Sequence, residues 1–196
     1  MLCCTPAQAR DSILVLGDSL SAAHNMTPES GWVALLAKQL DEMSCPADVV
    51  NASISGETTA GGLTRLPRLL ENSKPSIVIF ELGSNDGLRG FPIAEIHKNL
   101  QQMVALSQAA GARVLILGMR IPGNYGRRYT ESFANTFTVV GGENNTELLS
   151  FFLDGISEQE SLMQDDTIHP NERAQPLLRD RVLEVINPTL RCAQVR

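Results

Sequence analysis

The sequence has neither an excess of basic residues nor a long apolar run. Its 196 residues include 16 Lys and Arg against 22 Asp and Glu, which gives a formal net charge of -6. Nucleic-acid backbones and anionic membranes attract basic surfaces, so this charge argues against both partners. Apolar stretches such as Ser76–Phe80 are far shorter than the roughly 20 residues that cross a bilayer. We therefore expect no nucleic-acid partner and no membrane-spanning segment.

Cysteine and histidine are too few and too scattered for a familiar metal motif. The chain has 4 cysteines and 3 histidines. No two cysteines have the C-x-x-C spacing of a zinc or redox site, and the sequence contains no His-x-His pair. A two-metal phosphoesterase would need such clusters at its strand ends. We expect no metal ion and no cofactor.

The beginning of the chain resembles the end of a signal peptide. Residues 1–9 end in Ala7-Gln8-Ala9, a small-residue pattern that signal peptidases recognise. Residues 1–9 do not contain the basic and apolar stretches of a signal peptide, so a chance resemblance is the alternative. We expect residues 1–9 to be the end of a signal peptide, residues 10–196 to form a single domain, and the protein to be periplasmic or secreted.

After residue 10 the chain alternates apolar, β-branched runs with stretches of helical periodicity. This alternation is typical of a parallel sheet with helices on both faces, so we expect one three-layer α/β/α domain with five parallel strands. Ser30 is a candidate cap for the first helix, and Pro92 opens the third. The expected strands are Ser12–Leu16, Asp48–Asn51, Ser76–Leu82, Arg113–Gly118 and Glu147–Phe151. The expected helices include Thr58–Asn72, Glu172–Ile186, one with Trp32, Leu35, Leu36 and Leu40 on its apolar face, and one with Ile93, Ile96, Leu100, Met103 and Val104.

Polar segments follow the strands, at the edge of a parallel sheet where ligands bind. Ser19 follows the first strand, and Asp166 and His169 precede the last helix. A serine hydroxyl becomes a nucleophile when a neutral imidazole removes its proton and a carboxylate holds that imidazole. The short spacing lets Asp166 reach Nδ1 of His169 and leaves Nε2 for Ser19. We expect these three residues to form a catalytic triad.

Two further residues at this edge suit the binding of an oxyanion. Gly56 lets the main chain approach a substrate closely, and the Asn85 carboxamide donates a hydrogen bond without a formal charge. Together with the Ser19 N–H they would stabilise a tetrahedral intermediate. Each residue alone also has a structural explanation: a helix cap at Ser19 or Asp166, a positive φ at Gly56, or an Asx turn at Asn85. Their joint position at the strand ends favours catalysis.

The same segments carry a family resemblance. Gly17-Asp18-Ser19-Leu20, Gly56, Gly83-x-Asn85-Asp86 and Asp166-x-x-His169-Pro170 occur in the block order of the GDSL or SGNH hydrolases. The resemblance is greatest to the bacterial periplasmic thioesterases that are also lysophospholipases and arylesterases. It implies a flavodoxin-like fold and the hydrolysis of small acyl esters and thioesters through a serine, without a metal or cofactor. It also implies the triad and the oxyanion hole of Ser19, Gly56 and Asn85. We expect the protein to be a monomer.

Four apolar residues are candidates for an acyl-binding groove. Leu88 and Phe91 follow the third strand, and Ile121 and Pro122 follow the fourth. Packing against a neighbouring helix would explain these side chains equally well. A protein that binds a lipid or another small ligand at the same crevice, without chemistry, is the alternative function.

Two other histidines could serve as the base. His24 is near Ser19 in the sequence, but no carboxylate lies at a short spacing from it, so a surface loop is its expected place. His97 follows Ile96 on the third helix and is expected to flank the core or to face water.

Cys45 and Cys192 either pair in a disulfide or remain separate thiols. In a sheet of order 2-1-3-4-5, the first and last helices pack on the same face and run back to the amino ends of the strands. Cys45 follows the first helix and Cys192 follows the last. We predict that they pair opposite the active site, in an oxidising compartment.

Overall fold

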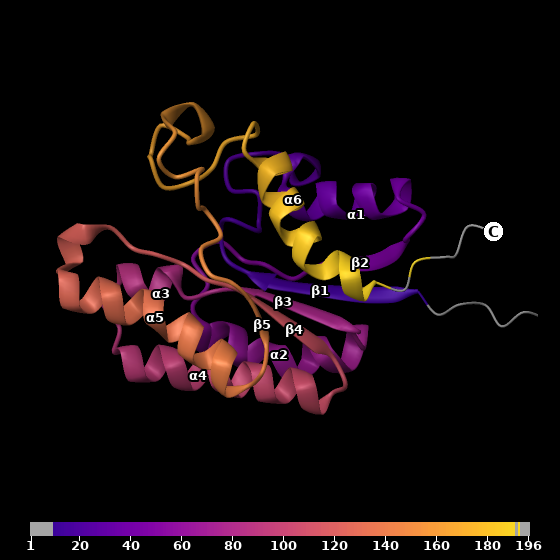
Figure 1. Cartoon of the computed structure of the whole chain (residues 1–196), viewed down its shortest axis with the longest axis horizontal. Coiled ribbons are helices and arrows are strands. Elements are labelled where there is room, and N and C mark those ends of the chain that lie inside the picture. Colours follow the sequence, from indigo (N-terminus) through magenta and orange to yellow (C-terminus); the bar gives the residue numbers. More distant parts are fainter. Residues whose placement is uncertain (1–9, 191, 193–196) are drawn as a thin grey trace, which may run out of the picture.

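A parallel sheet forms the centre of the fold (Figure 1), and the computed structural model of the chain describes residues 10–190 and 192. The strands in these residues are β1 (Asp11–Gly17), β2 (Ala47–Asn51), β3 (Ile77–Glu81), β4 (Arg113–Leu117) and β5 (Glu147–Leu149). These five strands lie in the order β2-β1-β3-β4-β5, and every neighbouring pair is parallel. The predicted five-stranded parallel sheet is therefore confirmed. The predicted end of a signal peptide lies outside the described residues.

Burial of the central strands explains their continuous apolar sequence. Ile13–Leu16 of β1, Val78–Phe80 of β3 and Leu115–Leu117 of β4 have no solvent exposure. A parallel strand with helices on both faces buries successive side chains in both directions, so its apolar residues need not alternate with polar ones. The edge strand β2 is more exposed and has the mixed sequence Ala-Asp-Val-Val-Asn.

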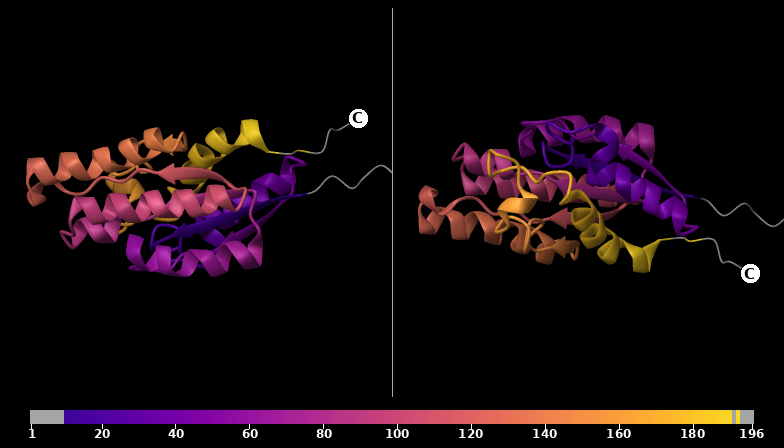
Figure 2. Two further views of the ribbon diagram at one scale, coloured as in Figure 1. Left: turned by 90° about the horizontal axis from the view of Figure 1, so that it is seen from below. Right: turned by 90° about the horizontal axis from the view of Figure 1, so that it is seen from above.

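Helices cover both faces of this sheet, which makes the predicted three layers. Their bounds are α1 (Trp32–Glu42), α2 (Thr59–Ser73), α3 (Ser84–Leu88), α4 (Ile93–Ala109), α5 (Arg127–Glu143) and α6 (Gln175–Ile186). Figure 2 shows α1 and α6 side by side on one face, and α2, α4 and α5 side by side on the other. In residues 10–190, no helix has both the length and the apolar character that a membrane span requires.

The predicted apolar faces of the helices pack against the sheet, with small differences at single positions. In α1, Trp32, Leu36 and Leu40 are buried as predicted, but Leu35 is only half-buried and Val33 is buried in its place. In α4 the predicted face is buried except at its first residue, which is half-buried. The buried residues of α4 are Ile96, Leu100, Met103, Val104 and Ser107.

The predicted cap of the first helix is wrong. Ser30 belongs to a short 3-10 turn, Pro28–Ser30, and Gly31 occupies the N-cap position of α1. The free N–H of Trp32 instead donates to the side-chain oxygen of the buried Gln175, at 3.0 Å. A side chain of α6 therefore accepts the hydrogen bond from the first N–H of α1. No local sequence pattern could indicate this contact.

The last helix also begins later than predicted. α6 starts at Gln175 and not at Glu172, because residues 172–174 form turns and Pro176 occupies the first helical turn. The last strand is shorter than predicted, since β5 ends at Leu149 and not at Phe151. The alternation of strands and helices implied a helix between β4 and β5 without giving its bounds, and α5 is that helix.

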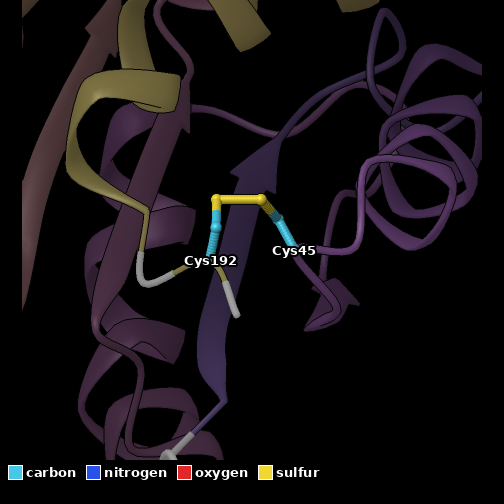
Figure 3. Close-up of a disulfide and its surroundings, with 2 residues drawn as sticks. All are labelled: Cys45 and Cys192. Carbon is cyan, nitrogen blue, oxygen red and sulfur yellow. A yellow bond between two sulfur atoms is a disulfide. The ribbon is translucent and has the colours of Figure 1, made fainter. Parts of the chain in front are cut away.

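A disulfide joins Cys45 and Cys192, as predicted (Figure 3). Their Cα atoms lie 4.2 Å apart, and 147 positions separate the two residues in the sequence. Cys45 lies between α1 and β2, and Cys192 follows α6. The bond therefore lies at the amino end of β2, at the edge of the sheet opposite the carboxyl ends of the strands.

Candidate active site

Three segments that follow strands meet at the carboxyl edge of the sheet. Ser19 lies just beyond β1, Asn85 belongs to α3 just beyond β3, and Asp166 and His169 lie in the long segment between β5 and α6. This segment, orange in Figure 1, projects on the side of the sheet that α1 and α6 cover. Sheets of this topology bind ligands at this edge, as expected for an active site.

Ser19, His169 and Asp166 form a chain of hydrogen bonds. Nε2 of His169 lies 2.9 Å from Oγ of Ser19, and Nδ1 lies 2.7 Å from Oδ2 of Asp166. The other carboxylate oxygen of Asp166 accepts the backbone N–H groups of Ile168 and His169, both at 2.9 Å. Because a carboxylate accepts the proton at Nδ1, the ring can present the lone pair of Nε2 to the serine hydroxyl. The structure thus brings together the three residues predicted to form a triad.

The turn around Asp166 stabilises its negative charge. Partial burial acts to raise the pKa of Asp166, but hydrogen bonds from the His169 N–H, the His169 ring and the Ile168 N–H outweigh it and lower the pKa to about 2. Thr167, within this turn, has a φ of 57°, in the left-handed region. The tight turn therefore supplies both the geometry and the ionised state of the carboxylate.

The three predicted oxyanion-hole residues follow three separate strands, β1, β2 and β3. Nδ2 of Asn85 donates to Oδ2 of Asp18 at 3.0 Å, which fixes the carboxamide and leaves the second N–H of that nitrogen for a ligand. Gly56 has a φ of +80°, a conformation that favours glycine. Its carbonyl accepts a hydrogen bond from the side chain of Arg89 at 3.1 Å. Arg89 caps the carboxyl end of α3, so it ties the loop after β2 to the helix that carries Asn85.

A buried pair of carboxyl groups lies behind this site. Asp18 is 1% exposed and Glu81 is 0% exposed. Oε2 of Glu81 accepts the Asp18 N–H at 3.1 Å and the Ser21 hydroxyl at 2.8 Å. Burial raises the pKa of Asp18 to about 6, against hydrogen bonds from the Leu20 N–H and from Asn85. Burial and the charge of Asp18 raise the pKa of Glu81 well above its usual value.

Both pKa shifts favour the protonated form of these buried groups, and Asp18 is the carboxyl group whose oxygen accepts the hydrogen bond from Asn85. The sequence reasoning missed this pair. The available signal was an acidic residue at the end of β3, a strand in which every residue is buried. An ionisable side chain in such a strand is rare unless it is paired with another group or is in its neutral form.

An apolar cavity opens beside the triad. Its volume is about 440 Å³, and its wall includes Ser19 and His169. Leu88, Ile121 and Pro122, three of the predicted acyl-binding residues, line it. A larger open hollow of about 800 Å³ between α4, α5 and β5 contains no residue of the triad. The wall of the smaller cavity also includes apolar side chains that the sequence reasoning did not single out: Met119, Phe151, Leu153, Met163 and Ile168.

Phe91, the fourth predicted acyl-binding residue, is not among the residues that line this cavity. Its N–H donates to the carbonyl of Asp86 at 3.0 Å, and its own carbonyl accepts the Tyr129 hydroxyl at 2.7 Å. Its side chain is half-buried and packs against the core. These contacts direct the chain after α3 toward α4, so the structure does not bring Phe91 together with the other three residues.

His24 lies in a loop, as predicted, but its ring packs against that of His169, which was not predicted. The two ring centroids are 4.3 Å apart, and His24 is half-buried. Ligand atoms of His24, Asp166 and His169 all lie within 4.8 Å of one another, so these residues could hold a metal ion. His97, in contrast, has Nε2 2.9 Å from a carboxylate oxygen of Glu143 on the surface.

Comparison with known proteins agrees with this geometry. Residues 15–176 match the GDSL-like Lipase/Acylhydrolase family. The chain is 47% identical to the esterase TesA of Pseudomonas aeruginosa, over 95% of this chain and 92% of that protein. It is 43% identical to thioesterase 1/protease 1/lysophospholipase L1 of Escherichia coli K12, over 93% of this chain and 86% of that protein.

A solved structure extends the similarity to the whole fold. The psychrotrophic esterase EstA from Pseudoalteromonas sp., inhibited by monoethylphosphonate, matches with a TM-score of 0.87 and 46% identity, over 91% of this chain and 97% of that one. The resemblance found in the sequence is thus confirmed by both comparisons. The chain therefore belongs to the GDSL-like lipase/acylhydrolase family, and it is an ester hydrolase.

Proposed function

We propose that this protein cleaves acyl esters and thioesters through an acyl-enzyme on Ser19, with His169 as the base and Asp166 as the carboxylate that orients it. The observation that carries the proposal is the continuous chain of contacts, 2.9 Å from Ser19 to His169 and 2.7 Å from His169 to Asp166. Both distances are those of good hydrogen bonds, and the order of the groups is that of an activated serine.

The proposed reaction has two halves. Nε2 of His169 takes the hydroxyl proton while Oγ of Ser19 attacks the carbonyl carbon, and Asp166 stabilises the imidazolium that forms. The tetrahedral oxyanion then receives hydrogen bonds from the N–H groups of Ser19 and Gly56 and from the free N–H of Asn85. His169 returns the proton to the departing alkoxide or thiolate. Water, deprotonated by the same imidazole, releases the carboxylic acid in the second half.

The cavity beside Ser19 suits an acyl chain as the common part of the substrates. Leu88, Ile121 and Pro122 supply apolar wall, and its volume of about 440 Å³ lies within the range of small-ligand sites. We propose that these three residues contact the acyl chain and that Phe91 does not. The substrate classes are fatty acyl thioesters, lysophospholipids and aryl esters, in which the acyl part is shared and the leaving group differs.

We further propose that residues 10–196 act as one exported domain, in the periplasm or outside the cell, and as a monomer. The disulfide between Cys45 and Cys192 supports an oxidising compartment. A monomer is sufficient because one chain supplies the triad, the oxyanion donors and the cavity. A small acyl ester or thioester is then the only partner that the chemistry needs.

The rival function is binding of an acyl ligand without reaction, and serine-directed labelling separates the two. An organophosphonate ester should form a covalent adduct on Ser19 in the wild-type protein, detected by intact mass and peptide mapping. The His169→Ala variant should lose this labelling, while His97→Ala, altered at the surface, should keep it. Absence of an adduct on folded wild-type protein would favour the binding function.

A further inference from the structure

The contact between two histidines has no part in the proposed reaction. The ring of His24 lies 4.3 Å from the ring of His169, centroid to centroid, with an angle of 37° between the two planes. Asp166 contacts the same His169 ring at Nδ1, at 2.7 Å. Two imidazoles and one carboxylate thus converge, and their ligand atoms lie within 4.8 Å of one another.

The two loops that carry these histidines are fastened together by Gln164. Its side-chain nitrogen donates to the carbonyl of His24 at 3.0 Å and to the carbonyl of Pro170 at 3.1 Å. Its backbone N–H donates to the carbonyl of His169 at 2.7 Å, and the N–H of His24 donates to the carbonyl of Ser19 at 3.2 Å. These bonds fix the backbones of both loops, so only side-chain torsion angles need to change when an ion binds.

We propose that His24, Asp166 and His169 form a binding site for Zn²⁺, and that zinc bound there reversibly inhibits the hydrolase. The inhibition rests on the function proposed above, whereas the binding does not. Imidazole nitrogen with one carboxylate oxygen is a donor set that zinc prefers, while Mg²⁺ and Ca²⁺ prefer oxygen donors.

The geometry requires only a small adjustment to reach zinc coordination. Zinc bonds of about 2.0 to 2.2 Å in a tetrahedron place the ligand atoms roughly 3.4 Å apart. A separation of 4.8 Å would therefore shrink by about 1.4 Å, and the 2.7 Å between Nδ1 of His169 and Oδ2 of Asp166 would lengthen by about 0.7 Å. Changes in side-chain torsion angles can supply this approach, because the site is at the rim and His24 is only half-buried.

Zinc at this site would block catalysis by replacing the proton at Nδ1 of His169. In the active state Nδ1 of His169 carries the proton shared with Asp166, and Nε2 is free to accept the proton of Ser19. A zinc ion bound to Nδ1 replaces that proton, which moves to Nε2. Nε2 then faces the hydroxyl as a donor and cannot act as the base. Removal of the ion restores the original tautomer.

The test compares zinc inhibition of the wild type with that of variants of His24. His24→Phe keeps an aromatic ring against His169 and removes the ligand nitrogen, and His24→Gln is a second variant in case the first folds poorly. His97→Phe is the matched control, because it removes a histidine remote from the triad. Hydrolysis of p-nitrophenyl acetate is measured against free Zn²⁺, followed by chelation with EDTA, with Mg²⁺ as the control ion.

We expect zinc to inhibit the wild type and His97→Phe equally, EDTA to restore activity, and Mg²⁺ to have no effect. The zinc concentration for half inhibition should rise by at least about tenfold in both His24 variants, as expected when one ligand is lost. The same half-inhibition concentration in folded His24 variants and in the wild type would overturn the proposal.

Calorimetry gives a second reading that does not depend on turnover. Titration of Zn²⁺ into Ser19→Ala protein should show one binding site, and the same titration into the His24→Phe form should not. Zinc binding without any hydrolase activity in the wild type would contradict the proposed function but not the zinc site. Failure of Ser19→Ala to bind zinc stoichiometrically would contradict the site itself.

Discussion

The second N–H of the Asn85 carboxamide is free because Asp18 accepts the first, at 3.0 Å. In the proposed mechanism this free N–H is one of three donors to the oxyanion. We expect Asn85→Ala to lower kcat by roughly 10² to 10³, the effect of removing one such donor. The measurement is a steady-state comparison on p-nitrophenyl esters, with circular dichroism as the check on folding. A change in KM alone would contradict the role.

The raised pKa of Glu81 predicts how stability depends on pH. The pKa of this buried residue is raised above its usual 4.5, so the folded state binds the proton more tightly than the unfolded state does. The stability that Glu81 contributes is therefore present below pH 4.5 and is lost as pH rises toward its folded pKa. Between these values the free energy of unfolding should fall by about 1.4 kcal/mol per pH unit on account of this group.

Glu81→Gln should remove this dependence, so the variant should gain stability relative to the wild type as pH rises above 4.5, the usual pKa of a glutamate. Urea unfolding at a series of pH values gives the two curves, and Glu71→Gln, at an exposed position, should run parallel to the wild type. Parallel curves for Glu81→Gln and the wild type would mean that Glu81 is ionised in the fold.

At the scale of elements, the short α3 and the segment after β4 form part of the wall of the cavity. Leu88, at the end of α3, lines the cavity, whereas Phe91 does not. Leu88→Ala should therefore reduce kcat/KM for octanoyl esters by about tenfold while changing acetyl esters little, since each buried methylene contributes about 0.8 kcal/mol. Phe91→Ala is the matched control and should show no such dependence on chain length. Equal losses for short and long chains in Leu88→Ala would exclude this wall from the acyl site.

The elements that could be predicted from the sequence are those with a strong local pattern. The buried strands carry continuous apolar runs, and α4 repeats its apolar residues with a helical period. Their boundaries depend on distant groups. The side chain of Gln175 in α6 accepts the first N–H of α1, so Ser30 does not cap that helix as expected. Such tertiary hydrogen bonds leave no periodic signal in either segment.

The residues of the candidate site could likewise be predicted only where the sequence carries a local signal. Ser19, Asp166 and His169 could be predicted because a triad has a known chemistry and Asp166 has a short spacing to His169. His24 could not be placed, because Gln164 of a remote loop brings it to His169. Leu88, Ile121 and Pro122 were predicted from the segments after β3 and β4, whereas Met119 and Phe151, which also follow strands, were not singled out.

At the scale of the whole molecule, the disulfide joins the segment between α1 and β2 to the end of the described chain. Replacing Cys45 and Cys192 together by serine should lower the free energy of unfolding by about 4 to 5 kcal/mol in the chain-entropy model, because the closed loop is long. The bond lies opposite the carboxyl edge of the sheet, so kcat should not change. Urea unfolding and steady-state kinetics on the double variant test both statements. A reductant should reproduce the loss in the wild type, and an unchanged urea midpoint would contradict the account.

The central claim is that the hydroxyl of Ser19 is the nucleophile. Its most direct test is the turnover of Ser19→Ala on an acyl thioester and on a p-nitrophenyl ester, with the melting temperature measured alongside. We predict a loss of kcat by several orders of magnitude on both substrates, as for other triad serines, with little change in melting temperature. Retention of more than about a hundredth of wild-type turnover by the folded variant would contradict the claim.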